Sequence, residues 1–205
     1  MNKTIIAISV TVGILLIALG FWFLPEISVG NEGNNQELSA MPQKNSGIDT
    51  QDNLTSFIAT LGTAAPTNNT FSPIPGVPDN LNLFSVEEAF GEDADKTKYI
   101  ILYFWASWCP NCEVFNHAVL PKEEVIQELN TSFKLVPVDC DNDPLKLSVQ
   151  FRVRAVPTFI FLSPDLEPAT VLPGSAPPAV FLQVLKYVSS GSYLNMTFSD
   201  FAEMS

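Results

Sequence analysis

Beyond about residue 81, the chain alternates between two kinds of hydrophobic pattern. Near-continuous apolar runs, typical of strands buried on both faces of a sheet, occur at 98–106, 133–140, 153–163 and, more weakly, 169–172. Segments with apolar residues at helical spacing lie between and after them, at 85–90, 109–120, 122–130, 144–151 and 177–190. Strands that alternate with helices predict an α/β fold with a central sheet flanked by helices.

The segment 109–120 is the expected helix that matters most for chemistry, because it follows the first buried strand directly. Its apolar residues Val114, Phe115, Ala118 and Val119 fall at helical spacing, which predicts that they share a face. Pro121 then closes or kinks the helix, since proline removes a main-chain donor.

The first 24 residues have a different pattern. Residues 5–24 carry no charged side chain, and twenty helical residues at ~1.5 Å each span the ~30 Å hydrocarbon core of a bilayer. Lys3 precedes this stretch and only acidic residues follow it closely, which predicts that the rest of the chain lies outside the cytoplasm. We expect residues 1–24 to be a transmembrane anchor. The alternative is a signal peptide cleaved near 28–30, which would release a secreted protein.

Composition divides the remainder into a linker and a domain. Residues 25–80 are rich in Asn, Gly, Ser, Thr and Pro, which predicts an extracytoplasmic linker with at most a short helix at 52–61. The folded domain, with a C-terminal extension, is expected at 81–205. The net charge of −12 opposes contact with phosphate backbones, so we expect no nucleic-acid partner.

Two cysteines three residues apart, in the stretch YFWASWCPNC, are the candidate reactive groups. Cys109 falls where the buried strand gives way to the helix, and the free N–H groups of a helix N-terminus stabilise a thiolate there. Pro110 suits the first helical position. Cys112 returns to the same face within disulfide reach, so Cys109 would act as the nucleophile and Cys112 as the resolving thiol of a redox-active Cys109–Cys112 disulfide.

Other uses of the two cysteines are weaker. A structural disulfide across such a short loop restrains the unfolded chain little. A zinc site needs four ligands, and only Cys140 and His117 remain to join the pair, so we expect no metal and no cofactor. His117, the only histidine, is expected to be a surface or packing residue, and Cys140 a small buried hydrophobic residue.

The stretch FWASWCPNC, followed after a helix, a strand and another helix by VRAVPTF, resembles the thioredoxin superfamily. The resemblance covers about 81–190. More narrowly, the chain resembles membrane-tethered extracytoplasmic thioredoxin-like proteins of the sulfur-oxidation-related type, through its N-terminal segment and its SGSY tail at 190–201.

That resemblance implies a thioredoxin fold with a mixed central sheet. It also implies a substrate-binding surface made by Trp108, by the backbone of Val156 and by Pro157, whose preceding peptide bond is expected to be cis. Core packing is the alternative role of Trp108. The partners implied are proteins with thiols or disulfides and a separate redox partner that recharges the pair.

One position departs from the pattern of the superfamily. Thioredoxins carry a buried Asp six positions before the first cysteine, where this chain has Tyr103. A buried carboxylate can take the proton of the resolving thiol. Glu113 is adjacent in sequence but should point elsewhere on the helix, so Cys112 must lose its proton to water or another group.

The sequence therefore predicts a membrane-anchored thiol:disulfide oxidoreductase acting on extracytoplasmic proteins. No Lys or Arg lies close to Cys109 in the sequence, which favours a reductase or a moderate exchanger over a strong oxidant. The alternative is a non-catalytic tethered factor of the same fold that binds peptides, delivers a metal or assists assembly.

Overall fold

The structure is a computed structural model that describes residues 74–204. The anchor predicted at 1–24, the helix predicted at 52–61 and most of the predicted linker lie outside these residues. Within 74–204, no helix has the length and apolar character needed to cross a membrane.

Four strands form one mixed sheet. They are β1 (Tyr99–Trp105), β2 (Phe133–Asp139), β3 (Thr158–Leu162) and β4 (Pro168–Pro173), arranged in the order β2-β1-β3-β4. β1 pairs parallel with β2 and antiparallel with β3, and β3 pairs antiparallel with β4. The prediction of an α/β fold with a mixed sheet flanked by helices is confirmed.

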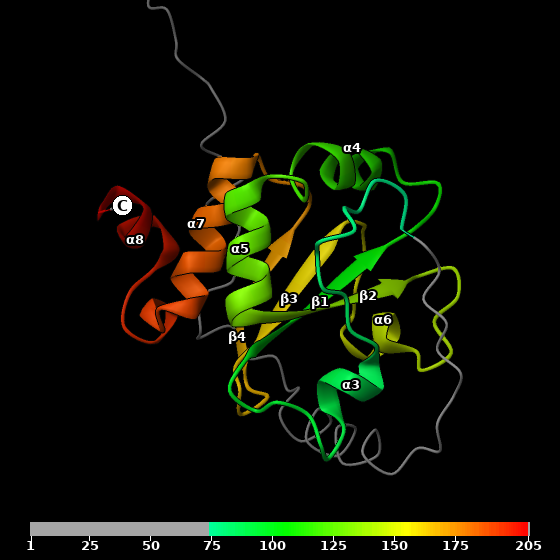
Figure 1. The fold of residues 1–205 in the computed structure, drawn as a ribbon, viewed down its shortest axis with the longest axis horizontal. Helices are drawn as coiled ribbons and strands as arrows, with labels where there is room; N and C mark the ends of the chain where they lie inside the picture. Colours follow the sequence, from blue (N-terminus) through cyan, green and yellow to red (C-terminus); the bar gives the residue numbers. More distant parts are fainter. Residues whose placement is uncertain (1–73, 205) are drawn as a thin grey trace, which may run out of the picture. The chain divides into compact units, whose positions relative to one another are not determined.

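Helices cover both faces of this sheet (Figure 1). They are α3 (Val86–Phe90), α4 (Pro110–Ala118), α5 (Glu123–Ser132), α6 (Leu147–Gln150), α7 (Pro178–Ser189), the 3-10 turn η2 (Ser192–Leu194) and α8 (Phe198–Met204). α5 and α7 pack side by side on one face of the sheet, and α8 lies against α7 (Figure 1).

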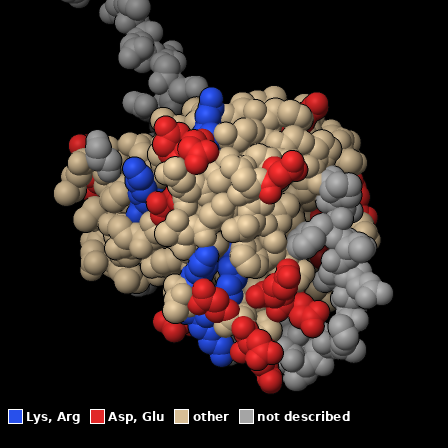
Figure 2. Space-filling view, viewed as in Figure 1, with Lys and Arg blue, Asp and Glu red and all other residues tan. Residues whose placement is uncertain are grey.

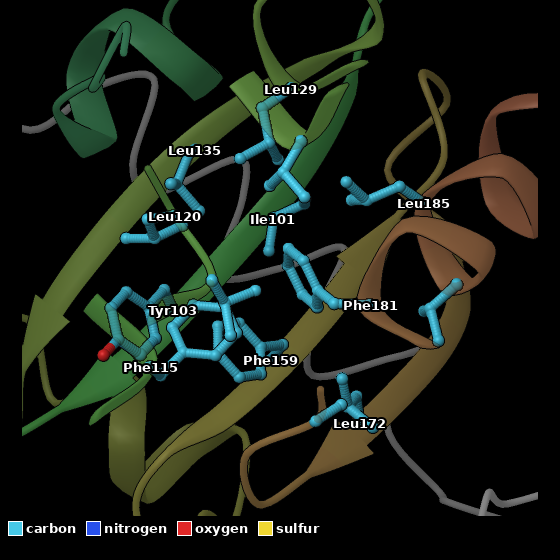
Figure 3. Close-up of a cluster of buried hydrophobic side chains, with 14 of the residues drawn as sticks. Ile101, Tyr103, Phe115, Leu120, Leu129, Leu135, Phe159, Leu172, Phe181 and Leu185 are labelled. Carbon is cyan, nitrogen blue, oxygen red and sulfur yellow. The ribbon is translucent and has the colours of Figure 1, made fainter. Parts of the chain in front are cut away.

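Strand β1 divides the apolar core into two layers, because its side chains alternate between the faces of the sheet. Ile101, Tyr103 and Trp105 belong to the larger cluster, which also takes side chains from α4, α5 and α7 (Figure 3). Ile100, Leu102 and Phe104 point the other way and join the side chains of α3 and α6 in the smaller cluster. A strand buried on both faces explains the uninterrupted apolar run in the sequence.

The packed part of the chain begins before residue 81. Ile74 and Leu81 are buried in the larger cluster, and Leu83 forms an isolated parallel bridge with Leu135 of β2. Ser85 then caps α3 by accepting a hydrogen bond from the Glu88 N–H, while the Glu88 carboxylate accepts one from the Ser85 N–H. This entry segment is therefore part of the folded unit.

The C-terminal extension packs on α7. Tyr187 of α7 contacts the rings of Phe198 and Phe201, and its hydroxyl donates a hydrogen bond to the Met196 carbonyl at 2.7 Å. The ring of Tyr193 lies edge-on to Tyr99 of β1. The tail thus extends the larger core beyond the last helix of the sheet layer.

Charge is unevenly distributed on the surface. Figure 2 shows wide uncharged areas on the face viewed, and the basic side chains there stand next to acidic ones. One of the few buried polar side chains among residues 74–204 is a lysine, Lys134 of β2, at 2% exposure.

Candidate active site at the Cys109–Cys112 disulfide

The candidate site lies where β1 ends and α4 begins. β1 runs to Trp105, a short turn follows, and Cys109 occupies the N-cap position of α4 with an extended backbone. Pro110 is the first helical residue, where its missing N–H leaves no intrahelical bond unmade. The buried strand therefore delivers Cys109 to a helix N-terminus, as the sequence predicts.

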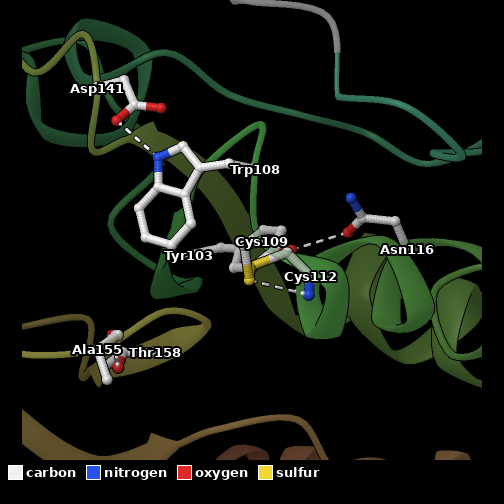
Figure 4. Close-up of a disulfide and its surroundings, with 8 residues drawn as sticks. All are labelled: Tyr103, Trp108, Cys109, Cys112, Asn116, Asp141, Ala155 and Thr158. Carbon is white, nitrogen blue, oxygen red and sulfur yellow. Dashed lines mark hydrogen bonds between the residues drawn. A yellow bond between two sulfur atoms is a disulfide. The ribbon is translucent and has the colours of Figure 1, made fainter.

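Cys109 and Cys112 form a disulfide with a Cα–Cα distance of 5.3 Å. Both residues are buried, at 4% and 1% exposure. The main-chain N–H of Cys112 donates to the Cys109 Sγ at 3.1 Å (Figure 4). After reduction, the same amide and the helix dipole are placed to stabilise a thiolate on Cys109 and so to lower its pKa.

Trp108, the residue before the pair, lies on the surface. Its side chain is 66% exposed, and its indole N–H donates to the Asp141 carboxylate at 3.0 Å (Figure 4). Core packing is therefore excluded for this tryptophan. Asp141 follows β2, and sequence reasoning did not connect it with Trp108, because the two residues meet only through the parallel pairing of β1 with β2.

The loop before β3 brings Val156 to the cluster that contains the disulfide, and the buried Pro157 follows it. The Val156–Pro157 peptide bond is cis. Val156 is half-buried and packs against the cluster that contains both cysteines. Its main-chain N–H and C=O make no hydrogen bond within residues 74–204, whereas the neighbouring Ala155 carbonyl accepts one from the Thr158 hydroxyl at 2.8 Å.

Tyr103 occupies the position of the buried acid of thioredoxins. Its side chain is fully buried, stacks on Phe159 with ring centroids 4.7 Å apart, and donates its hydroxyl proton to the Asn116 Oδ1 at 2.8 Å. Burial raises the pKa of the Tyr103 phenol, so it stays protonated near neutrality. Sequence reasoning missed Asn116, although its place four residues after Cys112 was a usable signal.

The buried face of α4 differs from the predicted one. Val114 is 58% exposed and Ala118 is also exposed, while Cys112, Phe115 and Asn116 point inward. The expectation that the apolar residues share a face was wrong for Val114 and Ala118, because the dithiol and its polar neighbour take the inward positions.

His117 lies on the exposed side of α4. Its Nδ1 is 2.9 Å from the Glu113 carbonyl oxygen, and its ring covers Gly76 so closely that any side chain there would clash. It is a surface packing residue, as the sequence predicts. Glu113 is exposed and lies next to Cys112 on α4.

Charged side chains occur in two loops of the chain, one after β2 and one before β3. Asp141 and the neighbouring acidic residues follow β2, whereas Arg152 and Arg154, the only arginines in the chain, are exposed in the loop that leads to Pro157. Within residues 74–204, no three metal-binding side chains converge on a common centre.

These features define a class of protein: an α/β fold that sets a dithiol at the N-terminus of a helix, beside an exposed tryptophan. Residues 86–189 match the family described as the thioredoxin-like domain. The chain belongs to this family.

Similar proteins extend the comparison. A region of 92 residues is 35% identical to the thiol:disulfide interchange protein DsbD of Campylobacter jejuni, and covers 43% of this chain but only 16% of that protein. A region of 91 residues is 28% identical to the thioredoxin of Pyropia yezoensis, covering 44% of this chain and 80% of that one. A thioredoxin-fold protein from Helicobacter pylori has a TM-score of 0.50 at 18% identity, covers 67% and 92% of the two chains, and supports the fold alone.

Proposed function

We propose that this chain is a thiol:disulfide oxidoreductase that acts on extracytoplasmic proteins through Cys109 and Cys112, held at the membrane by residues 1–24. The observation that carries this proposal is the hydrogen bond from the Cys112 amide to the Cys109 sulfur at the start of α4. Hydrogen bonds and dipoles aimed at a sulfur favour its anion, and the thiolate is the form that attacks disulfides.

The exchange proceeds in two balanced steps. In the reduced protein, the Cys109 thiolate attacks one sulfur of a substrate disulfide, and the other substrate sulfur leaves with the electron pair of the broken bond. Cys112 then attacks Cys109 in this mixed disulfide, its proton passes to the departing substrate sulfur, and the protein disulfide forms. The substrate gains two electrons, and a separate partner must return two electrons to the protein.

Substrate peptides dock across Trp108 and the backbone of Val156 in this proposal. The indole is exposed beside Cys109, and the main chain of Val156 has free hydrogen-bonding groups among the described residues. An extended peptide can pair with such a segment through its own main chain. The backbone contact then holds the peptide and leaves its side chains free to vary.

The proposed direction is reduction or moderate exchange. A strong oxidant needs a strongly stabilised thiolate. The side chain next to the pair on the exposed side of α4 is the acidic Glu113, and a further carboxylate, Asp141, holds Trp108. Negative charge near Cys109 opposes an extreme thiolate. The similarity of 92 residues to a thiol:disulfide interchange protein supports a role in disulfide exchange.

Cysteine substitutions in the full chain test this function. The purified wild-type chain should catalyse the reduction of insulin disulfides by dithiothreitol, and Cys109→Ser should abolish that catalysis. Cys140→Ser is the matched control and should keep it. Cys112→Ser, expressed in the native membrane, should accumulate mixed disulfides through Cys109 that identify the partners. Equal catalysis by wild type and Cys109→Ser would leave only a non-catalytic binding role.

A further inference from the structure

The Tyr103–Asn116 pair has no part in the exchange steps described above. Within residues 74–204 it is the only hydrogen bond that joins two buried side chains, with exposures of 0% and 2%. Burying two polar groups is costly unless they are paired, and an apolar pair of the same shape would avoid that cost. The cost of burying this pair therefore suggests that it has a role beyond packing, which depends on where it lies in the fold.

That place is directly beside Cys112. Asn116 follows Cys112 by four residues on α4, so the two side chains occupy one face of the helix with Cβ atoms roughly 5–6 Å apart. Tyr103 comes from β1, its ring contacts Phe115 and Phe159, and it belongs to the same buried cluster as both cysteines. Figure 4 draws the disulfide, Tyr103 and Asn116 together and marks the hydrogen bond from the Tyr103 hydroxyl to Asn116.

The direction of that hydrogen bond fixes what the phenol can offer to a thiol. A phenol has one proton and two lone pairs, and here the proton is donated to the Asn116 Oδ1. The phenolic oxygen therefore keeps acceptor capacity on the side away from Asn116. Burial raises the pKa of the Tyr103 phenol and an amide does not titrate, so the pair is neutral near pH 7.

We propose that Tyr103 and Asn116 are positioning residues for the resolving thiol: in the reduced protein, the Tyr103 oxygen accepts a hydrogen bond from the Cys112 S–H. This proposal rests on the proposed function, because it assigns a role in the dithiol state. The hydrogen bond keeps Cys112 protonated and oriented while Cys109 carries the negative charge. It exists only in the dithiol, since the disulfide has no S–H, and so it stabilises the reduced form selectively.

The test is the equilibrium constant for reduction of the protein disulfide by dithiothreitol. Tyr103→Phe in the full chain keeps the ring and its stacking but removes the acceptor. A hydrogen bond contributes roughly a threefold to tenfold factor, so the constant should fall by about that much. A tenfold fall corresponds to a potential about 30 mV more negative. The unpaired Asn116 amide affects both redox states alike and cancels from the constant.

Two further variants control for folding. Tyr187→Phe also deletes a phenol that makes a hydrogen bond, in this case to the Met196 carbonyl on the C-terminal extension, and it should leave the constant unchanged. The double variant Tyr103→Phe/Asn116→Leu replaces both partners by apolar groups, so its folded state contains no unpaired amide. Its equilibrium constant should fall by the same factor as that of Tyr103→Phe.

The outcomes separate this proposal from the proposed function. If both Tyr103 variants have the constant of the wild type and of Tyr187→Phe, the positioning role is wrong. Failure of the wild type to reduce insulin disulfides would instead overturn the proposed function, and the redox constant can be measured without that activity.

Discussion

Cys140 is distant from Cys109 in the sequence but lies beside the end of β1, in surroundings that disfavour its thiolate. It is half-buried, its N–H donates to the Trp105 carbonyl at the end of β1, and aspartates stand on both sides of it in the chain. Burial is the main cause that raises the pKa of Cys140 to about 11, and the charges of Asp143, Asp139 and Asp141 add to it.

We therefore expect Cys140 to resist alkylation near neutrality. A pKa of about 11 leaves a thiolate fraction on the order of 0.1% at pH 8, against about a quarter for an ordinary cysteine. Iodoacetamide should modify Cys140 at least tenfold more slowly than free cysteine at pH 8, and the rate should rise up to about pH 11. Mass spectrometry of the oxidised protein, in which the other two cysteines are blocked, measures this rate. A rate equal to that of free cysteine would contradict the shielding.

Single residues show where sequence reasoning succeeds and where it stops. The pairing of Cys109 with Cys112 could be predicted from the sequence, because the two residues are three apart at the start of one helix. The carboxylate partner of Trp108 could not be predicted from the sequence, because Asp141 is 33 residues away in the chain. Asn116 was missed because asparagine is usually exposed, although its place four residues after Cys112 on α4 puts it on the same face of the helix.

Elements were predicted better than their faces. The apolar runs located the four strands, because strands buried on both sides read as continuous hydrophobic sequence. The inward face of α4 was misjudged, because apolar spacing cannot show that a dithiol and an amide will take the buried positions. β2 contains a second residue whose burial the sequence did not predict. Lys134, a charged residue, is buried at the strand position opposite Ile100.

Lys134 links β2 to α3. Its Nζ lies 3.4 Å from the Ala89 carbonyl oxygen, near the C-terminal end of α3, where a cation is favourable. Burial nevertheless lowers the pKa of Lys134, and the nearby Asp95 offsets only part of that effect. A lysine whose pKa is lower when folded is more easily deprotonated in the folded state, so the folded state gains stability relative to the unfolded one as pH rises toward about 10.5.

Lys134→Met should be at least as stable as the wild type at pH 7, because it removes the cost of burying a charge. Its advantage should shrink between pH 7 and pH 10, where the wild-type amine loses its proton in the folded state. Urea unfolding of both proteins at the two pH values measures the difference. Lys122→Met, at an exposed position, should show no such trend. A wild type more stable than Lys134→Met at pH 7 would mean that the contacts of the ammonium outweigh its burial.

At the scale of the molecule, the described residues form one packed unit from the entry segment at Ile74 to the tail. Both ends contribute to the larger cluster, Ile74 at one end and Phe198 at the other. The pattern of strands and helices in the sequence does not predict that the tail packs on the domain. The sequence showed only that the tail resembles the ends of some related proteins. Its docking depends on rings of α7 and β1 that meet it in space, which no local pattern reveals.

Phe198 provides the test of that docking. It is 5% exposed, and its ring is edge-on to Tyr187 with centroids 5.5 Å apart. Phe198→Ala should lower the free energy of unfolding by about 3 kcal/mol, because it removes a buried ring and leaves a cavity. Met204→Ala, at a position 77% exposed, should change it by less than about 0.5 kcal/mol. Both values follow from urea unfolding monitored by tryptophan fluorescence. If the tail were a separate appendage, Phe198→Ala would change the free energy of unfolding as little as Met204→Ala does. If the tail belongs to the domain, Phe198→Ala destabilises the whole domain. The redox constant of the disulfide should stay unchanged.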